Sequence, residues 1–171
     1  IEKRLSFIEN LKVYARTIHK DITLDETLDV SYSYSKKDNL TIKEDLKLQF
    51  EKSLVKELEL GYTTLGPHRD DIEFYLNDKN VRDYGSQGQQ RLSVLCMKFA
   101  EVELFNEKKD EYPILLLDDI FSELDINKRN SIVKYLNKGV QVFITSTDIN
   151  DIDKSILSNS KVYNIKDGNI V

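Results

Sequence analysis

The stretch from Tyr112 to Asp125 constrains the fold of this chain more than any other part of it. Its sequence, YPILLLDDIFSELD, places four consecutive aliphatic residues directly before two aspartates. Such a run predicts a strand buried on both faces of a parallel sheet, whose end delivers carboxylates to the edge where phosphate ligands bind. The alternative is a core strand followed by an aspartate that caps a helix.

The first interpretation corresponds to a Walker B motif and gives the two aspartates different roles. Asp118 is predicted to hold Mg²⁺ directly or through water, because this cation prefers oxygen ligands. Asp119 is predicted to orient or deprotonate the water that attacks a γ-phosphate. The motif thus indicates a nucleotide site at the end of a parallel strand.

A second informative segment, from Tyr84 to Arg91, combines Gly, Ser and Gln before a helix that is expected to run to about Glu107. A helix that opens in this way presents unpaired amide groups, a hydroxyl and the positive end of its dipole to an anion. The alternative is a capping box formed by Ser86 and Gln89 without any ligand. The aspartate strand in the same chain favours the anion site.

The sequence contains no phosphate-binding P-loop to accompany these motifs. Gly61 and Gly66 have the required spacing, but Pro67 and His68 stand where a lysine and a Ser or Thr are needed. Proline lacks an amide proton, and histidine cannot replace the lysine charge that reaches the phosphates. The sequence therefore predicts a Walker B without a Walker A.

The remaining segments show periodicity without recognisable chemistry. Apolar residues at helical spacing predict helices over about 1–20 and, from a capping box at Thr41 and Glu44, over about 41–59. Alternating apolar and polar residues predict a half-exposed antiparallel strand from Leu28 to Tyr34. The other expected elements are strands near 72–75 and at Val81 joined by a turn at 77–80, a short helix around 132–136, a second buried strand over 140–145 ending at the same rim as Asp118, and a C-terminal hairpin over 162–171.

Composition limits the class of protein. A chain of 171 residues with 40% hydrophobic residues can bury a core, and its net charge of −5 gives no bulk attraction to nucleic acid or to an anionic membrane. The single cysteine, Cys96, falls in an apolar helical pattern, which predicts a buried thiol and a reducing setting. No apolar run approaches the roughly 18 residues of a membrane span. His19 is expected at the surface or in the last turn of a helix.

Three motifs, in this order, resemble the bacterial RecF recombination-repair proteins, a family of ABC-type ATPases. GPHRDD at 66–71 narrows the resemblance to RecF. SQGQQR at 86–91 is similar to the ABC signature motif, and Asp118 and Asp119 followed by SELD at 122–125 are similar to a Walker B with its D-loop. ABC heads usually carry Glu after the Walker B Asp, and the shorter Asp119, as in RecF, implies slow hydrolysis. The resemblance covers 61–148 by motifs and 1–60 by pattern only.

The resemblance implies an α/β fold, namely the C-terminal part of a P-loop ABC-type ATPase head with a parallel sheet and flanking helices, plus a small α+β arm. We expect the arm over 1–60 and the head over 61–171. The Walker A would lie in an N-terminal portion outside this sequence, so that this chain alone would be inactive.

The resemblance also implies how the site residues act. In RecF-like ATPases two heads sandwich two ATP molecules, so each signature motif contacts the γ-phosphate that the partner holds. The signature residues are Ser86, Gln87, Gly88 and Gln89. Ser122 and Asp125 of the D-loop would lie at the dimer interface, and Thr147 stands where a histidine that senses the γ-phosphate is common.

The implied cofactors are ATP and Mg²⁺, and the implied partners are DNA at single-strand/double-strand junctions, a second copy in an ATP-dependent homodimer, and the RecR and RecO proteins, in the cytoplasm and without a membrane. The full-length protein would be a slow DNA-dependent ATPase. One alternative is an SMC-like or overcoming-lysogenization-type ATPase head, and another is a non-enzymatic interaction domain that keeps the strand and loop as scaffold. Three roles are open for His68 and Arg69, namely contact with DNA, contact with nucleotide across the dimer, and a salt bridge to Asp70 or Asp71.

Overall fold

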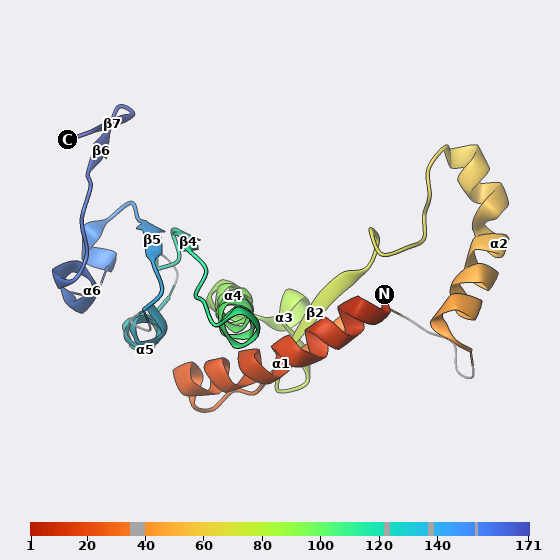
Figure 1. Ribbon diagram of the computed structural model, residues 1–171, viewed down its shortest axis with the longest axis horizontal. Helices are drawn as coiled ribbons and strands as arrows, with labels where there is room; N and C mark the ends of the chain where they lie inside the picture. The colour runs from red at the N-terminus through yellow and green to blue at the C-terminus, as the bar shows by residue number, and fades with distance from the viewer. Residues whose placement is uncertain (35–39, 122–123, 137–138, 153) are drawn as a thin grey trace.

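A computed structural model describes residues 1–34, 40–121, 124–136, 139–152 and 154–171 (Figure 1). In chain order the elements are α1 (Glu2–Thr23), β1 (Leu28–Ser33), α2 (Ile42–Leu60), β2 (Asp71–Leu76), β3 (Lys79–Asn80), α3 (Val81–Tyr84), α4 (Gln87–Lys109), β4 (Leu115–Asp118), α5 (Ile126–Leu136), β5 (Val142–Thr145), the 3-10 helix η1 (Ile149–Asp151), α6 (Lys154–Ser158), β6 (Ile165–Lys166) and β7 (Asn169–Ile170). The expected α/β class is confirmed, because the chain combines flanking helices with a parallel strand pair.

The central body packs α1 and α4 together beside an antiparallel sheet in the order β1-β2-β3 (Figure 1). Helix α1 turns one apolar stripe inward, since its buried residues recur every three or four positions. Near the end of α4, Glu107 accepts a hydrogen bond at 2.9 Å from the hydroxyl of Tyr14, which lies in the middle of α1. In the sheet, Val30 of β1 lies opposite Phe74 of β2. The sheet and the two helices therefore share one core.

The second sheet consists of β4 and β5, which run parallel. The expectation that these strands are buried on both faces is wrong for this chain. Leu115 and Leu117 join the core cluster, but Leu116 is 73% exposed, and Phe143 on β5 is 54% exposed. Alternate residues of a strand point to opposite faces, so the described residues cover one face of this sheet and leave an apolar face open.

Val81 does not form the expected partner strand. β3 ends one residue earlier, and Val81 begins the short helix α3 with its side chain buried. The reason is local, because the Asn80 side chain accepts a hydrogen bond from Arg82 N at 2.9 Å and so caps a helix. The hairpin between β2 and β3 is thus shorter than the apolar pattern indicates.

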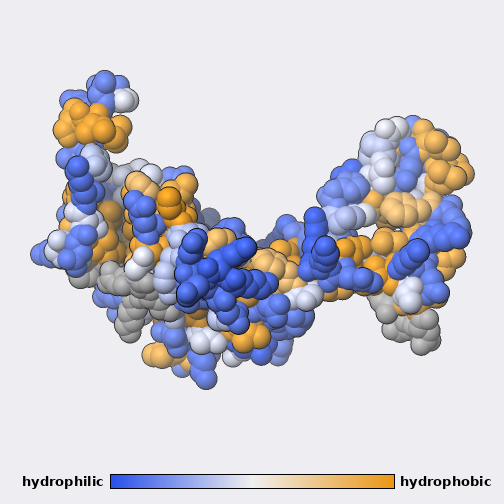
Figure 2. Space-filling view, viewed as in Figure 1, coloured by the Kyte–Doolittle hydropathy of each residue, from blue (hydrophilic) through white to orange (hydrophobic). Residues whose placement is uncertain are grey.

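Helix α2 lies apart from the central body, at the right of the view in Figure 1. The capping box at its start is confirmed, with Thr41 and Glu44 bonded reciprocally. Much of its apolar surface is exposed, with Leu58 at 74%, and Figure 2 shows hydrophobic colour over this end of the molecule. The division at residue 60 stays a prediction, and the pairing of β1 with β2 and the packing of α1 on α4 join the two ranges across it.

The C-terminal hairpin is confirmed, although its strands are two residues each. Asp167 and Gly168 both have positive φ, at 52° and 77°, which is the backbone of a two-residue hairpin turn. Within the described part of the chain, no helix has the length and apolar character needed to cross a membrane.

Candidate functional site

The loop that opens α4 is held by its own capping box. Ser86 Oγ accepts from Gln89 N at 3.2 Å, and Gln89 Oε1 accepts from Ser86 N at 2.9 Å. The capping-box interpretation is therefore confirmed as local structure. It does not exclude an anion, because no described residue accepts a hydrogen bond from the amides of Gln87 and Gly88, at the positive end of a long helix.

The segment before this loop is tied to the helix as well. The Gln90 side-chain amide donates to the carbonyl oxygens of Gly85 at 3.2 Å and Val81 at 3.3 Å. A Cβ on Gly85 would lie 2.5 Å from the Val81 carbonyl oxygen, so only glycine fits this close approach. These contacts consequently restrict the backbone conformation of the turn that precedes the loop.

A carboxylate from a distant segment also reaches the loop. Glu26, between α1 and β1, accepts a hydrogen bond at 2.6 Å from the side-chain amide of Gln89. Its other oxygen, Oε2, lies 3.9 Å from His19 Nε2. The expectation of a surface position for His19 is wrong, because the residue is fully buried although it lies in the last turns of α1. Burial lowers the pKa of His19 below 6.5, with a smaller opposing effect from Glu26.

We expect this buried histidine to make the protein less stable in acid. The unfolded chain binds a proton near pH 6.5 and the folded chain only at lower pH, so the contribution of His19 to stability is present above pH 6.5 and is lost as the pH falls through the lowered pKa. Thermal unfolding at pH 7.5 and pH 5.5, followed by circular dichroism, measures the loss. His19→Leu should show a smaller loss than the parent, whereas His68→Gln, at an exposed site, should match the parent.

At the end of β4, the two aspartates meet the end of β5. Asp118 lies opposite Thr145 in register, and the Thr145 hydroxyl donates to the Asp118 carboxylate. Asp119 N lies 3.2 Å from both the carbonyl and the hydroxyl oxygen of Thr145. The strand ends therefore share one rim, as predicted. Asp119 has φ 47°, a left-handed conformation that aspartate and asparagine adopt more readily than most residues.

The oxygen donors at this rim fit Mg²⁺. That ion keeps several waters and is usually bound by one or two carboxylates together with phosphates of the substrate. Asp118 is exposed and offers one carboxylate beside a hydroxyl. The described residues contain no group of three or more His, Cys, Asp or Glu that could hold a metal. Waters and phosphate oxygens would therefore complete the coordination.

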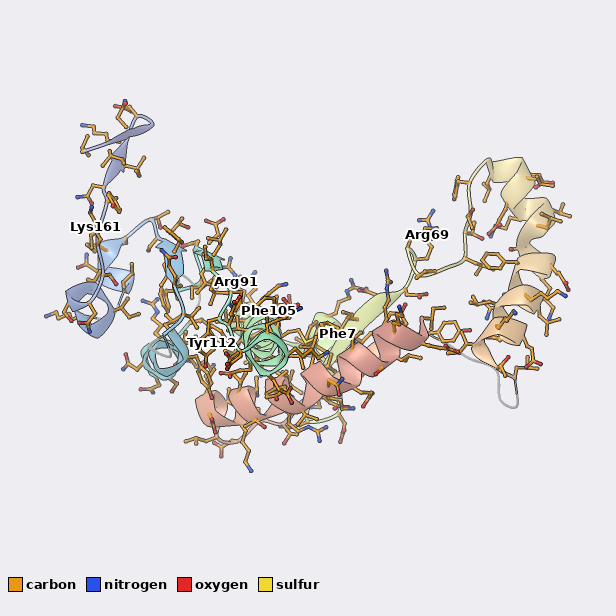
Figure 3. The ribbon with its side chains drawn as sticks, in the orientation of Figure 1. Phe7, Arg69, Arg91, Phe105, Tyr112 and Lys161 are labelled. Carbon is orange, nitrogen blue, oxygen red and sulfur yellow. The ribbon has the colours of Figure 1, made fainter. Side chains whose placement is uncertain are left out.

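Arg91 connects the two motifs within the chain. It lies in the first turns of α4, and its guanidinium Nη1 donates to the Asp119 carbonyl at 3.3 Å (Figure 3). The capped loop and the aspartate strand are thus parts of one contiguous unit. The motif that included Arg91 was visible in the sequence, but its link to the aspartate strand was not.

The other predicted site residues have separate surroundings. Asp125 caps α5, accepting from Lys128 N at 3.0 Å, and the Lys128 ammonium at 2.9 Å lowers the pKa of Asp125. Ser122 lies outside the described residues. Thr147 is exposed beyond β5, while Asp148 caps η1 through Asn150 N at 2.8 Å. The placement of Asp125 and Thr147 at the surface leaves both accessible to a second molecule.

The GPHRDD loop joins α2 to β2 and is fixed by carboxylate contacts. Tyr32 donates to Asp70, and Arg82 pairs with Asp71 at 3.2 Å. Arg69 instead lies over the Tyr62 ring at 5.4 Å, and Figure 3 shows it pointing away from β2. Among the described contacts, the salt bridge from His68 or Arg69 to these aspartates is not formed. DNA and nucleotide remain as candidate ligands of the two basic residues.

Sequence reasoning assigned no role to two residues that contribute to the site. Thr145 was expected to end a strand at the same rim as Asp118 but without a role there, and it bonds both to Asp118 and to the amide of Asp119. Glu26 gave no signal, because 63 residues separate it from Gln89 and its neighbours form no motif.

A parallel strand pair with aspartates at its end, linked to a loop that presents free amides at a helix start, defines part of an ABC-type ATPase head. No family model matches the chain. Among curated proteins it is 43% identical over 176 residues to the DNA replication and repair protein RecF of Ligilactobacillus salivarius, covering 99% of the chain and 46% of that protein. It is 41% identical over 175 residues to RecF of Staphylococcus carnosus, covering 99% and 47%. The chain belongs to the RecF family and spans about half the length of the curated relatives it matches.

Solved structures agree with this assignment. The recombination mediator protein RecF, in a RecF-ATPrS structure from the RecFOR pathway, matches with a TM-score of 0.72 and 36% identity, over 98% of this chain and 44% of that one. A RecF-ATP structure matches with a TM-score of 0.68 and 38% identity, over 89% and 42%. An SMC head bound to the C-winged helix domain of ScpA matches with a TM-score of 0.56 at 14% identity, over 97% and 43%, which shows a shared fold alone.

Proposed function

We propose that this chain is the C-terminal portion of a RecF ATPase head, which supplies the signature motif and the Walker B to an ATP-bridged dimer that clamps DNA. The observation that carries the proposal is the joining of the two motifs by the Arg91–Asp119 hydrogen bond. Because this bond links the loop to the strand end, a phosphate bound at one would be positioned relative to the other. The similarity of about 40% to RecF proteins supports the choice of family.

Each site residue then has a role that its surroundings permit. The loop residues Ser86, Gln87, Gly88 and Gln89 would receive the γ-phosphate held by the partner, through amide and hydroxyl hydrogen bonds. Asp118, oriented by Thr145, would hold Mg²⁺, which when bound neutralises charge on the phosphates. Asp119 would accept a proton from the attacking water or orient it. Ser122 and Asp125 would contact the partner head, and Thr147 would sense the γ-phosphate.

The complete protein would act as a slow DNA-dependent ATPase in recombinational repair and at replication forks. Its DNA target would be a junction of single and double strands, and the RecR and RecO proteins would work with it to load recombinase. The RecFOR pathway named for the two solved RecF structures supports this set of partners. An SMC-like ATPase head remains the second candidate, but at 14% identity the SMC match supports only the fold.

We expect the isolated chain to bind Mg-ATP weakly or not at all. The P-loop amides and lysine supply most contacts to a triphosphate, and this sequence contains no P-loop. Isothermal titration calorimetry of the chain against Mg-ATP tests this, with the complete protein as the positive control. Micromolar binding by the chain alone would contradict the assignment of half a site to it.

A further inference from the structure

The contact between Glu26 and Gln89 involves a residue to which the proposed function gives no role. We propose that Glu26 is a positioning residue for the signature loop: by holding the Gln89 side chain, it fixes the orientation in which the loop presents Ser86 and Gly88 to a ligand. The proposal rests on the proposed function in one respect only, namely that the ligand is the γ-phosphate of a partner head.

The Gln89 side chain is engaged at both ends. Its oxygen accepts from Ser86 N at 2.9 Å, and its nitrogen donates to Glu26 at 2.6 Å. The second bond is short and has a charged acceptor, which makes it stronger than the neutral bond of the capping box. An ordinary capping box is closed by local residues alone, whereas this one is tethered to a segment 63 residues earlier in the chain.

Glu26 is itself placed by its surroundings. Its side chain is 26% exposed, and its second oxygen approaches the fully buried ring of His19. The Nε2 atom of that ring has no hydrogen-bond partner among the described residues. Two residues before Glu26, Leu24 adopts φ 62°, a conformation that a leucine keeps only where the rest of the structure enforces it. This turn ends α1 and leads the chain back toward the start of α4.

The hydrogen bond from Gln89 to Glu26 fixes the orientation of the loop at the start of α4. Water would satisfy the Gln89 amide without any protein partner, and withdrawing a carboxylate from water costs free energy. A helix start that must meet a phosphate over short hydrogen bonds depends on direction as well as on the number of donors. The contact with Glu26 restricts the first turn of α4 in addition to the Gln90 contacts with Gly85 and Val81.

The test compares Glu26→Ala, Glu26→Gln and the neighbouring control Asp25→Ala in the complete protein. Hydrogen–deuterium exchange without nucleotide reports the loop peptide 86–91, sedimentation with ATP reports dimerisation, and calorimetry reports Mg-ATP binding. In Glu26→Ala we expect loop exchange to rise about tenfold and the dimer Kd to rise about tenfold, as for one lost charge-assisted hydrogen bond, with Mg-ATP binding by the monomer unchanged. Glu26→Gln retains an acceptor, so its loop exchange and dimer Kd should stay close to those of the parent. Asp25→Ala should change neither quantity.

Gln89→Met approaches the same contact from the other side and guards against a folding defect in Glu26→Ala. If Glu26 acts through Gln89, adding Glu26→Ala to Gln89→Met should change exchange and dimerisation little further. Unchanged loop exchange in Glu26→Ala would overturn the proposal. A second variant, Ser86→Arg, tests whether the dimer depends on the loop at all. If Ser86→Arg abolishes the dimer but Glu26→Ala speeds loop exchange without weakening dimerisation, the proposal is also overturned. If Glu26→Ala speeds loop exchange while neither Glu26→Ala nor Ser86→Arg affects dimerisation, the ATP-bridged dimer is refuted, and the role of Glu26 in holding the loop stands.

Discussion

Replacing Ser86 with arginine in the complete protein is expected to abolish ATP-dependent dimerisation and DNA retention while each monomer still binds nucleotide. A loop at the start of α4 can meet a γ-phosphate only when a second head brings that phosphate to it, so ATP bridges an interface in which both copies use the same surface. The arginine charge would attract phosphate, but its length would hold the two surfaces apart. The steric effect should dominate, because the bridge depends on short hydrogen bonds.

Two further variants separate the causes. Ser86→Ala removes the cap, which costs about 0.5–2 kcal/mol of helix stability, together with the hydroxyl proposed to meet the phosphate, and should weaken the dimer less than arginine does. Val94→Arg adds the same side chain at a partly exposed position further along α4 and should leave dimerisation intact. Sedimentation with and without ATP measures all three. If Ser86→Arg still dimerises on addition of ATP, the loop is an ordinary helix cap.

Replacing Asp119 with asparagine is expected to slow ATP turnover by roughly 10²-fold or more while ATP binding persists, since a general base contributes about 10²–10⁴-fold. The carboxamide cannot accept the proton from water. The local backbone should be unchanged, because asparagine tolerates the left-handed φ of 47° and keeps the hydrogen bond from its backbone amide to Thr145. Steady-state phosphate release and nucleotide binding, measured on the same preparation, distinguish lost chemistry from lost affinity.

Asp110 provides a matched control for this substitution. It also has a left-handed backbone, with φ 55°, and it ends α4 away from the aspartate strand. Asp110→Asn therefore makes the same chemical change in the same conformation and should leave turnover unaltered. Turnover that is also unaltered in Asp119→Asn would move the basic role to another residue, with Asp118 and Thr147 as the next to test.

Local periodicity and local capping were sufficient to predict most elements of this fold. The helices around Leu11, Leu46 and Cys96 and the parallel pair ending at Asp118 and Thr145 follow from side-chain patterns within each segment. Burial was harder, because it depends on what covers an element. The apolar run through Leu116 predicts a strand buried on both faces, yet the described residues cover only the face of Leu115 and Leu117 and leave Leu116 exposed.

The same distinction applies to the candidate site. Its motif residues were readable because their spacing is local, from Ser86 to Gln89 and from Asp118 to Asp119. His19 lies four residues after Ala15, on the buried stripe of α1, and that spacing was the available sign of its burial. The Glu26 contact depends on the turn at the end of α1 and on the packing of α1 against α4, which no short pattern encodes.

Helix α4 is held near both of its ends, by Glu26 in the loop after α1 near its start and by Tyr14 of α1 near its finish. These two contacts, which lie far apart on one helix, restrict sliding of α4 along α1 and independent movement of the loop at the start of α4. If bound nucleotide moves α4, we expect α1 to move with it, together with β1 and β2, which share the same core. Because this sheet continues into the loop that carries Arg69, a closing motion between two heads would also reposition that arginine.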